Sequence, residues 1–148
     1  MGTNVLSESE PPLWAVAPQF LPCLKSRGFL FGSLVKVSNG DLLMISGQVA
    51  LDEGGHLVGE YDLRLQATQV FENIKRLLAS FKADFSNIVK ITIYIVNYKV
   101  EDRAILVEVR EQYIDPEHYP ASTLIGVQSL ARPDFMIEIE AMAAIDSG

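Results

Sequence analysis

The chain has 148 residues, of which 49% are hydrophobic and 21% are charged, and its formal net charge is −7. This length suits a single folded domain with a buried core. The acidic balance, without a cluster of Lys and Arg, argues against nucleic acid as a partner, because such binding depends on clustered cations. No apolar run approaches the roughly 18 residues that a membrane span needs, so no membrane partner is expected.

Few residues are suited to disulfide or metal chemistry. Cys23 is the single cysteine, which excludes an internal disulfide, and His56 and His118 are too few and too scattered for a metal-ligand set. We expect no metal. The N-terminus carries Glu8 and Glu10 rather than the basic region of a signal peptide, so the expected location is cytoplasmic.

Residues 1–30 are expected to form a proline-rich N-terminal extension, followed by a domain over 31–148. The prolines of the extension are Pro11, Pro12, Pro18 and Pro22. The extension either drapes over the domain, or helps to form an oligomer contact, or is a disordered tail up to about Ser9. After it, the apolar runs 34–38 and 41–46 flank Asn39-Gly40, which predicts a hairpin.

An amphipathic helix is predicted over 64–81, with Asp62 as its start and a Glu72–Arg76 pair on its wet side. Spacings of three and four place its apolar residues on one stripe. The stripe consists of Ala67, Val70, Phe71, Ile74, Leu77, Leu78 and Phe81.

The next element is a strand over 88–96 that is apolar on both sides and hence predicted to be buried on both faces. One side carries Ile91, Ile93 and Ile95, and the other carries Val89, Tyr94 and Val96. A second helix over 100–113 follows and ends at Asp115-Pro116. Its inward residues are predicted to be Ala104, Ile105, Val109 and Tyr113.

Two closing strands, over 123–127 and 135–144, complete an α+β fold with one mixed sheet. Right-handed crossovers place both helices on one face of this sheet. The apolar residues on the other face exceed what a soluble monomer exposes, so we expect a second copy of the chain to cover it. Any cleft then lies at a subunit boundary.

The last strand alternates strictly, so Glu138 and Glu140 project from the same face. A carboxylate flanked by Ile and Met loses hydration unless a partner compensates it. The two acids either form a wet strand face or serve a site.

Five segments of the chain stand in a characteristic order: Ser46-Gly47-Gln48, Gln66–Ile74, Asn87–Thr92, Pro120-Ala121 and Ile137–Ala141. In this order they resemble the Rid (YjgF) family of reactive-intermediate deaminases, over about Leu34 to Ile145. The resemblance implies a chorismate-mutase-like fold and a homotrimer with clefts between protomers. It also implies hydrolysis of the C=N bond of small enamines and imines, without a cofactor.

Two positions depart from the pattern that the resemblance implies. Family members with this activity carry arginine, which clamps the substrate carboxylate, where this chain has Ser122. A cleft tyrosine of the family is replaced by Phe31. The resemblance implies a retained oxyanion or carbonyl contact at Ser46 and a water-handling carboxylate at Glu140.

Other residues complete the predicted site. Gly47 either lets the backbone approach a ligand or forms a simple bulge. Arg110, where many relatives carry a cleft asparagine, is the first candidate to return the missing positive charge, and Arg132 is the second. The hydroxyls of Ser122 and Thr123 either bind a ligand or belong to an ordinary strand.

Three functions remain open from the sequence. The first is hydrolytic deamination of small imines or enamines with altered specificity. The second is a trimer that binds keto acids or other small carboxylates without turnover. The third, a ribonuclease or inhibitor of translation, conflicts with the net charge of −7.

Overall fold

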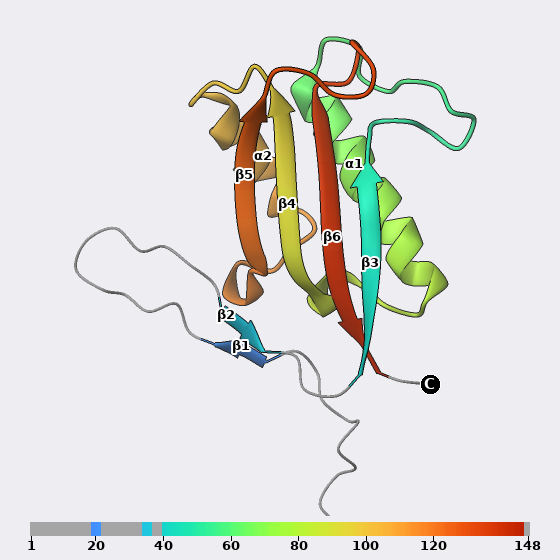
Figure 1. Ribbon diagram of the computed structural model, residues 1–148, viewed down its shortest axis with the longest axis vertical. Coiled ribbons are helices and arrows are strands. Elements are labelled where there is room, and N and C mark those ends of the chain that lie inside the picture. The colour runs from blue at the N-terminus through green and yellow to red at the C-terminus, as the bar shows by residue number, and fades with distance from the viewer. Residues whose placement is uncertain (1–18, 22–33, 37–39, 147–148) are drawn as a thin grey trace, which may run out of the picture.

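The computed structural model describes residues 19–21, 34–36 and 40–146. Its main sheet has four strands in the order β3–β6–β4–β5 (Figure 1). These strands are Asp41–Gln48, Ile137–Ile145, Ile88–Val96 and Ala121–Val127, respectively. Because β4 and β5 are parallel while β6 is antiparallel to β3 and β4, the predicted α+β fold with a mixed sheet is confirmed.

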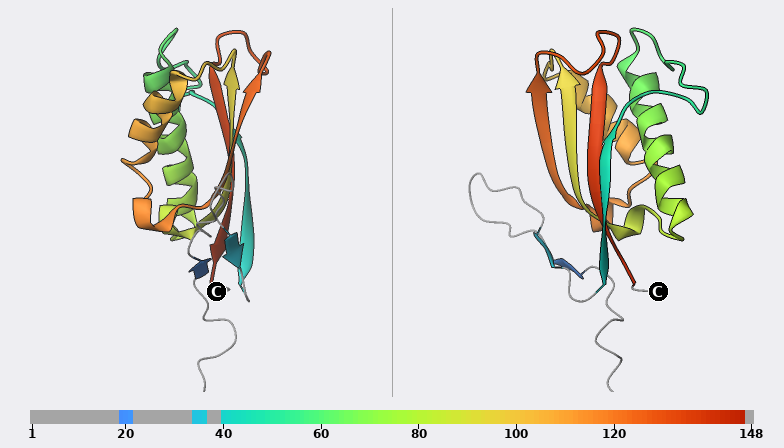
Figure 2. Two further views of the ribbon diagram at one scale, coloured as in Figure 1. Left: turned by 90° about the vertical axis from the view of Figure 1, so that its left-hand side faces the viewer. Right: turned by 45° about the vertical axis from the view of Figure 1, so that its right-hand side comes forward.

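Both helices, α1 (Leu63–Ser80) and α2 (Asp102–Arg110), cover the same face of the sheet (Figure 2). α1 follows β3 and leads to β4, and α2 connects β4 to β5. Crossovers between parallel strands are right-handed, which explains why the helices share one face, as predicted. The other face, here called the open face, carries no helix within the described residues.

The start of α1 follows the sequence prediction, since the Asp62 carboxylate accepts a hydrogen bond from the Leu65 amide at 3.0 Å. The predicted stripe is buried at Ala67, Val70, Phe71, Ile74 and Leu78. Leu77 and Phe81 are instead 40% and 57% exposed. Leu77 lies at the margin of the stripe, and Phe81 follows the last helical residue.

The predicted Glu72–Arg76 pair is wrong. Arg76 contacts Glu53 at 2.7 Å, and the Glu72 carboxylate accepts a hydrogen bond from the Tyr113 hydroxyl at 2.8 Å. An i,i+4 pair contributes only about 0.2–0.5 kcal/mol, so partners from other elements can replace it.

The second helix is shorter than predicted and presents a different residue to the core. Leu106 and Val109 are buried, whereas Ala104, expected inside, is exposed. A leucine removes far more apolar area from water than an alanine, which favours the orientation that buries Leu106. Tyr113, beyond the end of the helix, stacks on Phe71 at 5.1 Å between ring centroids.

The predicted hairpin between 34–38 and 41–46 is also wrong. β2 (Leu34–Lys36) pairs with β1 (Gln19–Leu21), whereas β3 pairs with β6. Gly40 has a φ of +126°, and a Cβ there would lie 2.7 Å from the Ile145 carbonyl oxygen. The glycine therefore permits a close approach to the end of β6, a requirement that the local sequence cannot distinguish from a turn.

The expected extension over 1–30 lies outside the described residues except for Gln19–Leu21, and Cys23 and Phe31 also lie outside them. In the part of the chain that is described, neither helix has the length and apolar character to cross a bilayer.

Gln66 connects α1 to the loops on either side. It is fully buried, and its amide nitrogen donates to the carbonyls of Gly59 at 3.1 Å and Asp134 at 2.9 Å. Its amide oxygen accepts from the Met136 backbone at 2.8 Å. One side chain thus satisfies three backbone groups that would otherwise be buried without partners.

We expect Gln66→Ala to lower the free energy of unfolding by about 3 kcal/mol, because it leaves these groups unsatisfied. Denaturant unfolding measures the change. Gln112→Ala is the matched control, since that side chain is exposed and makes one bond of 3.3 Å, to the Glu108 carbonyl. Equal losses in the two variants would contradict this account.

Candidate functional site

A row of polar residues crosses the open face at the middle of the sheet. Thr92 on β4 lies opposite Glu140 on β6 and opposite Thr123 on β5. On the far side of β6, the β3 ladder is interrupted between Ile45 and Gln48, where Ser46 and Gly47 face the position of Glu140. The structure thus brings four predicted site residues, from three strands, into one row.

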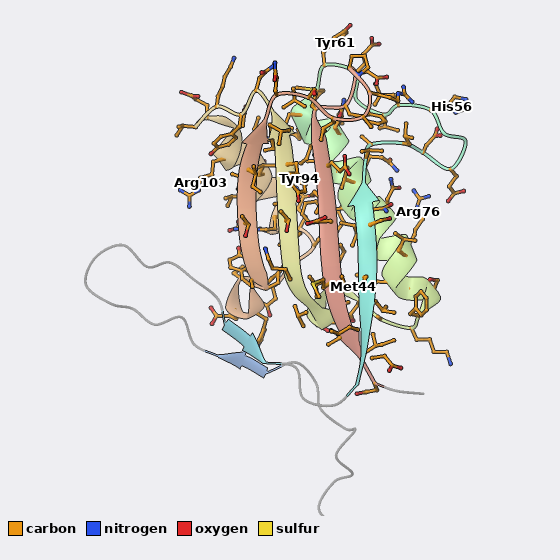
Figure 3. The ribbon with its side chains drawn as sticks, in the orientation of Figure 1. Met44, His56, Tyr61, Arg76, Tyr94 and Arg103 are labelled. Atoms are coloured by element: carbon orange, nitrogen blue, oxygen red, sulfur yellow. The ribbon has the colours of Figure 1, made fainter. Side chains whose placement is uncertain are left out.

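Glu140 has a hydrogen-bond partner that the sequence reading missed. The Tyr94 hydroxyl donates to its Oε1 at 3.0 Å, and Tyr94 lies on the inner strand β4 (Figure 3). This bond to Glu140 raises the pKa of Tyr94, with smaller contributions from desolvation and from the negative charges of Glu140 and Glu138. The phenol therefore remains a proton donor well above neutral pH.

Lys90 is a second missed residue of this face. Its Nζ donates to the Thr123 hydroxyl at 2.8 Å, to the Ile91 carbonyl at 3.1 Å and to the Thr92 hydroxyl at 3.4 Å. The prediction that β4 is apolar on both sides is therefore wrong. Lys90 and Tyr94 flank Thr92 at alternate positions, a period of two that was visible in the sequence.

The bulge in β3 makes room for the side chain of Glu138, the second carboxylate on this face. A Cβ at Gly47 would lie 1.8 Å from Glu138 Oε1, so glycine at 47 makes room for the Glu138 side chain. Gln48 closes the bulge by donating from its amide to the Ser46 carbonyl at 2.9 Å. Of the two readings for Gly47, the bulge is present, and the space beside it is occupied by Glu138.

We expect Gly47→Ala to destabilise the fold by about 1 kcal/mol, because the added methyl group displaces the Glu138 side chain. Chemical denaturation of four proteins provides the test: the parent, Gly47→Ala, Glu138→Ser and the double variant. The cost of the alanine should vanish in the Glu138→Ser background. A cost that persists there would show that the clash lies elsewhere.

A second group of predicted residues lies on the helix side of the sheet. Ser122 is opposite the buried Ile91, and it lines a pocket of about 100 Å³ between β5 and α2. Arg110 lines the same pocket, with its guanidinium 4.4 Å from the centroid of the Tyr119 ring. The other lining residues are Ile93, Arg103, Leu106, Val107 and Leu124.

Arg110 is incompletely paired in this pocket. Its Nε is buried and has no hydrogen-bond partner among the described residues. A buried donor without a partner is costly, so a ligand acceptor at this position would compensate it. Arg132, the other candidate cation, is paired with both carboxylate oxygens of Asp134 and packs over Phe135 at 4.7 Å.

The sheet separates the two groups within one chain. Ser122 and Arg110 lie on the helix side, whereas Thr123 and Glu140 lie on the open face with Tyr94. Phe31 falls outside the described residues. A single protomer therefore offers a cation pocket on one side and a carboxylate row on the other.

The remaining candidates do not join either group. His56 lies beside Asp52, and His118 lies beside Asp115, both at exposed positions. Among the residues that the structure describes, no three His, Cys, Asp or Glu side chains gather as a metal site.

The sequence and the fold match a known class of protein. The model of the family described as Endoribonuclease L-PSP matches residues 31–145. A solved Rid-family protein of unknown function, YyfB from Yersinia pestis, is 37% identical and superimposes with a TM-score of 0.71. That similarity covers 75% of this chain and 84% of the other.

Two curated relatives extend the comparison. The RutC family protein PH0854 of Pyrococcus horikoshii is 33% identical, over 72% of this chain and 82% of its own length. A 2-iminobutanoate/2-iminopropanoate deaminase of Dermatophagoides farinae is 26% identical, over 74% of this chain and 83% of its own length. The chain belongs to the Rid (YjgF) family, and the resemblance drawn from its sequence is confirmed.

Proposed function

We propose that this protein hydrolyses small reactive imines and their enamine tautomers, with a specificity that differs from relatives that carry arginine at position 122. The observation that carries the proposal is the pocket that Ser122 and Arg110 line together, in which the buried Arg110 Nε has no hydrogen-bond partner among the described residues. The similarity to an iminobutanoate/iminopropanoate deaminase supports the reaction class.

Arg110 would hold the carboxylate of the substrate. A serine cannot pair with a carboxylate through two parallel N–H bonds, whereas a guanidinium can. The pocket of about 100 Å³ is small, which favours a compact acid over an extended one. Its Leu106 and Leu124 walls would exclude water from that ion pair.

Glu140 would handle the protons of the attacking water. The water oxygen bonds to the C=N carbon while the carboxylate takes one proton of the water and passes it to the nitrogen. The C–N bond of the resulting carbinolamine then breaks while its hydroxyl proton moves to the departing nitrogen, which releases ammonia and leaves a carbonyl compound. An enamine enters the same sequence after protonation at carbon, and no cofactor takes part.

The site would be assembled between chains, because the sheet separates Arg110 from Glu140 within one protomer. We propose a homotrimer in which the open face is covered and the pocket of one copy meets the carboxylate row of the next. The exposed apolar side chains Leu42 (49%) and Met44 (72%) on β3 support such a contact. Figure 3 shows the position of Met44.

Sedimentation velocity at micromolar concentration tests the assembly, and we expect a trimer. Met44→Asp should weaken it, because the variant would bury a charge in the contact. Val100→Asp is the control, since Val100 is 78% exposed and lies in the connection between β4 and α2, outside the strands of the open face. A wild-type monomer would contradict the proposal.

Ammonia release from enzymatically generated imino acids tests the reaction. We expect Glu140→Gln to lower kcat by roughly a hundredfold through loss of the proton acceptor. Arg110→Gln should raise KM by roughly tenfold or more, because it removes a charged partner of the carboxylate.

Arg76→Gln is the control for Arg110, because Arg76 is a surface residue of α1 paired with Glu53. Ammonia release at the uncatalysed rate across a broad panel of imino acids would count against the enzyme. The second candidate function is a trimer that binds small keto acids without turnover, and serine in place of arginine at position 122 supports it. Calorimetric binding of keto acids without ammonia release would favour this candidate. The net charge of −7 argues against a ribonuclease.

A further inference from the structure

Tyr94 and Glu140 form a side-chain pair across β4 and β6. Tyr94 lies opposite Glu138, and Glu140 lies opposite Thr92, two residues along the ladder. The phenol therefore reaches Glu140 diagonally, with 3.0 Å between its oxygen and Oε1. Figure 3 shows Tyr94 on β4, toward the carboxyl end of this inner strand.

Among the described residues, Tyr94 is the one side chain that donates a hydrogen bond to Glu140. Lys90, the nearby cation of β4, directs its Nζ to Thr123, Thr92 and a backbone carbonyl. Glu140 is itself exposed, so solvent alone would leave its side chain with several rotamers. Because the Tyr94 hydroxyl holds Oε1 in place, the direction of Oε2 of the same carboxylate is fixed as well.

We infer that Tyr94 is a positioning residue that holds the Glu140 carboxylate ready to take a proton from the attacking water. The phenol occupies Oε1 and leaves Oε2 as the acceptor. This inference rests on the proposed function of Glu140. It adds a residue on the central strand that aligns the acid without contacting the substrate.

The surrounding charges keep the phenol in its donating form. Glu138 and Glu140 on β6 are the two carboxylates near Tyr94, and Lys90 is the charged residue of its own strand. Ser46 on β3 and Thr123 on β5 contribute hydroxyl groups that do not titrate in this range. The raised pKa of Tyr94, caused first by its bond to Glu140, agrees with this arrangement.

Tyr94→Phe removes the hydroxyl and keeps the ring. We expect kcat to fall roughly tenfold while KM changes little, because the carboxylate of the substrate is held elsewhere. Tyr113→Phe is the matched control, since it removes a tyrosine–carboxylate bond of 2.8 Å, to Glu72, on the helix side of the sheet. A loss of kcat that is equal in both variants would overturn the inference.

A double-mutant cycle separates positioning from a general structural effect. If Tyr94 acts through Glu140, then Tyr94→Phe should have no further effect on kcat in the Glu140→Gln background. A purely structural role would lower kcat by the same factor in both backgrounds. That result would overturn the inference while leaving the proposed function intact.

A measurement that does not depend on catalytic activity tests the Tyr94–Glu140 hydrogen bond itself. Tyrosine titration followed by NMR of ring-labelled protein, with Tyr94→Phe used to assign the signal, should show a raised Tyr94 pKa in the parent. In Glu140→Gln the pKa of Tyr94 should fall toward its ordinary value, because the charged acceptor is gone. An unchanged Tyr94 titration would overturn the pair itself, whether or not the protein releases ammonia.

Discussion

The alternation of side chains along β6 determines both the core and the candidate site. Ile137, Ile139 and Ala141 point toward the helices and are buried, while Glu138 and Glu140 point to the open face. The register that buries Ile139 against β4 is the same register that sets Glu140 opposite Thr92. A slip by one residue would bury both carboxylates and expose the isoleucines, so the apolar core itself holds the acids in place.

Elements with a strong local period were predictable from the sequence. β4 has the predicted bounds, α1 begins at its predicted cap, and the two acids of β6 share a face as expected. Each of these depends on a pattern within one segment. Strand partners were not predictable in the same way, because Asn39-Gly40 indicates a change of direction without specifying which strands then pair.

It was harder to predict from the sequence on which side of the sheet a residue lies. Ser122 and Thr123 are both small hydroxyl residues on a strand whose exposure does not alternate cleanly. Only the register with β4 shows that one faces α2 and the other faces Lys90. Lys90 and Tyr94 were missed for a related reason, since only their partners on β5 and β6 show that these two side chains belong to the polar row.

The buried amide of Gln66 has a consequence for the segment that precedes β6. The Met136 backbone N–H donates to a side chain of α1, so separating this loop from the domain breaks buried hydrogen bonds to the helix. Its amide hydrogen should be sheltered from solvent exchange about as well as those of the helix. The loop that contains Asp134 and Met136 has no regular secondary structure, yet we expect it to open about as rarely as the helix that binds it.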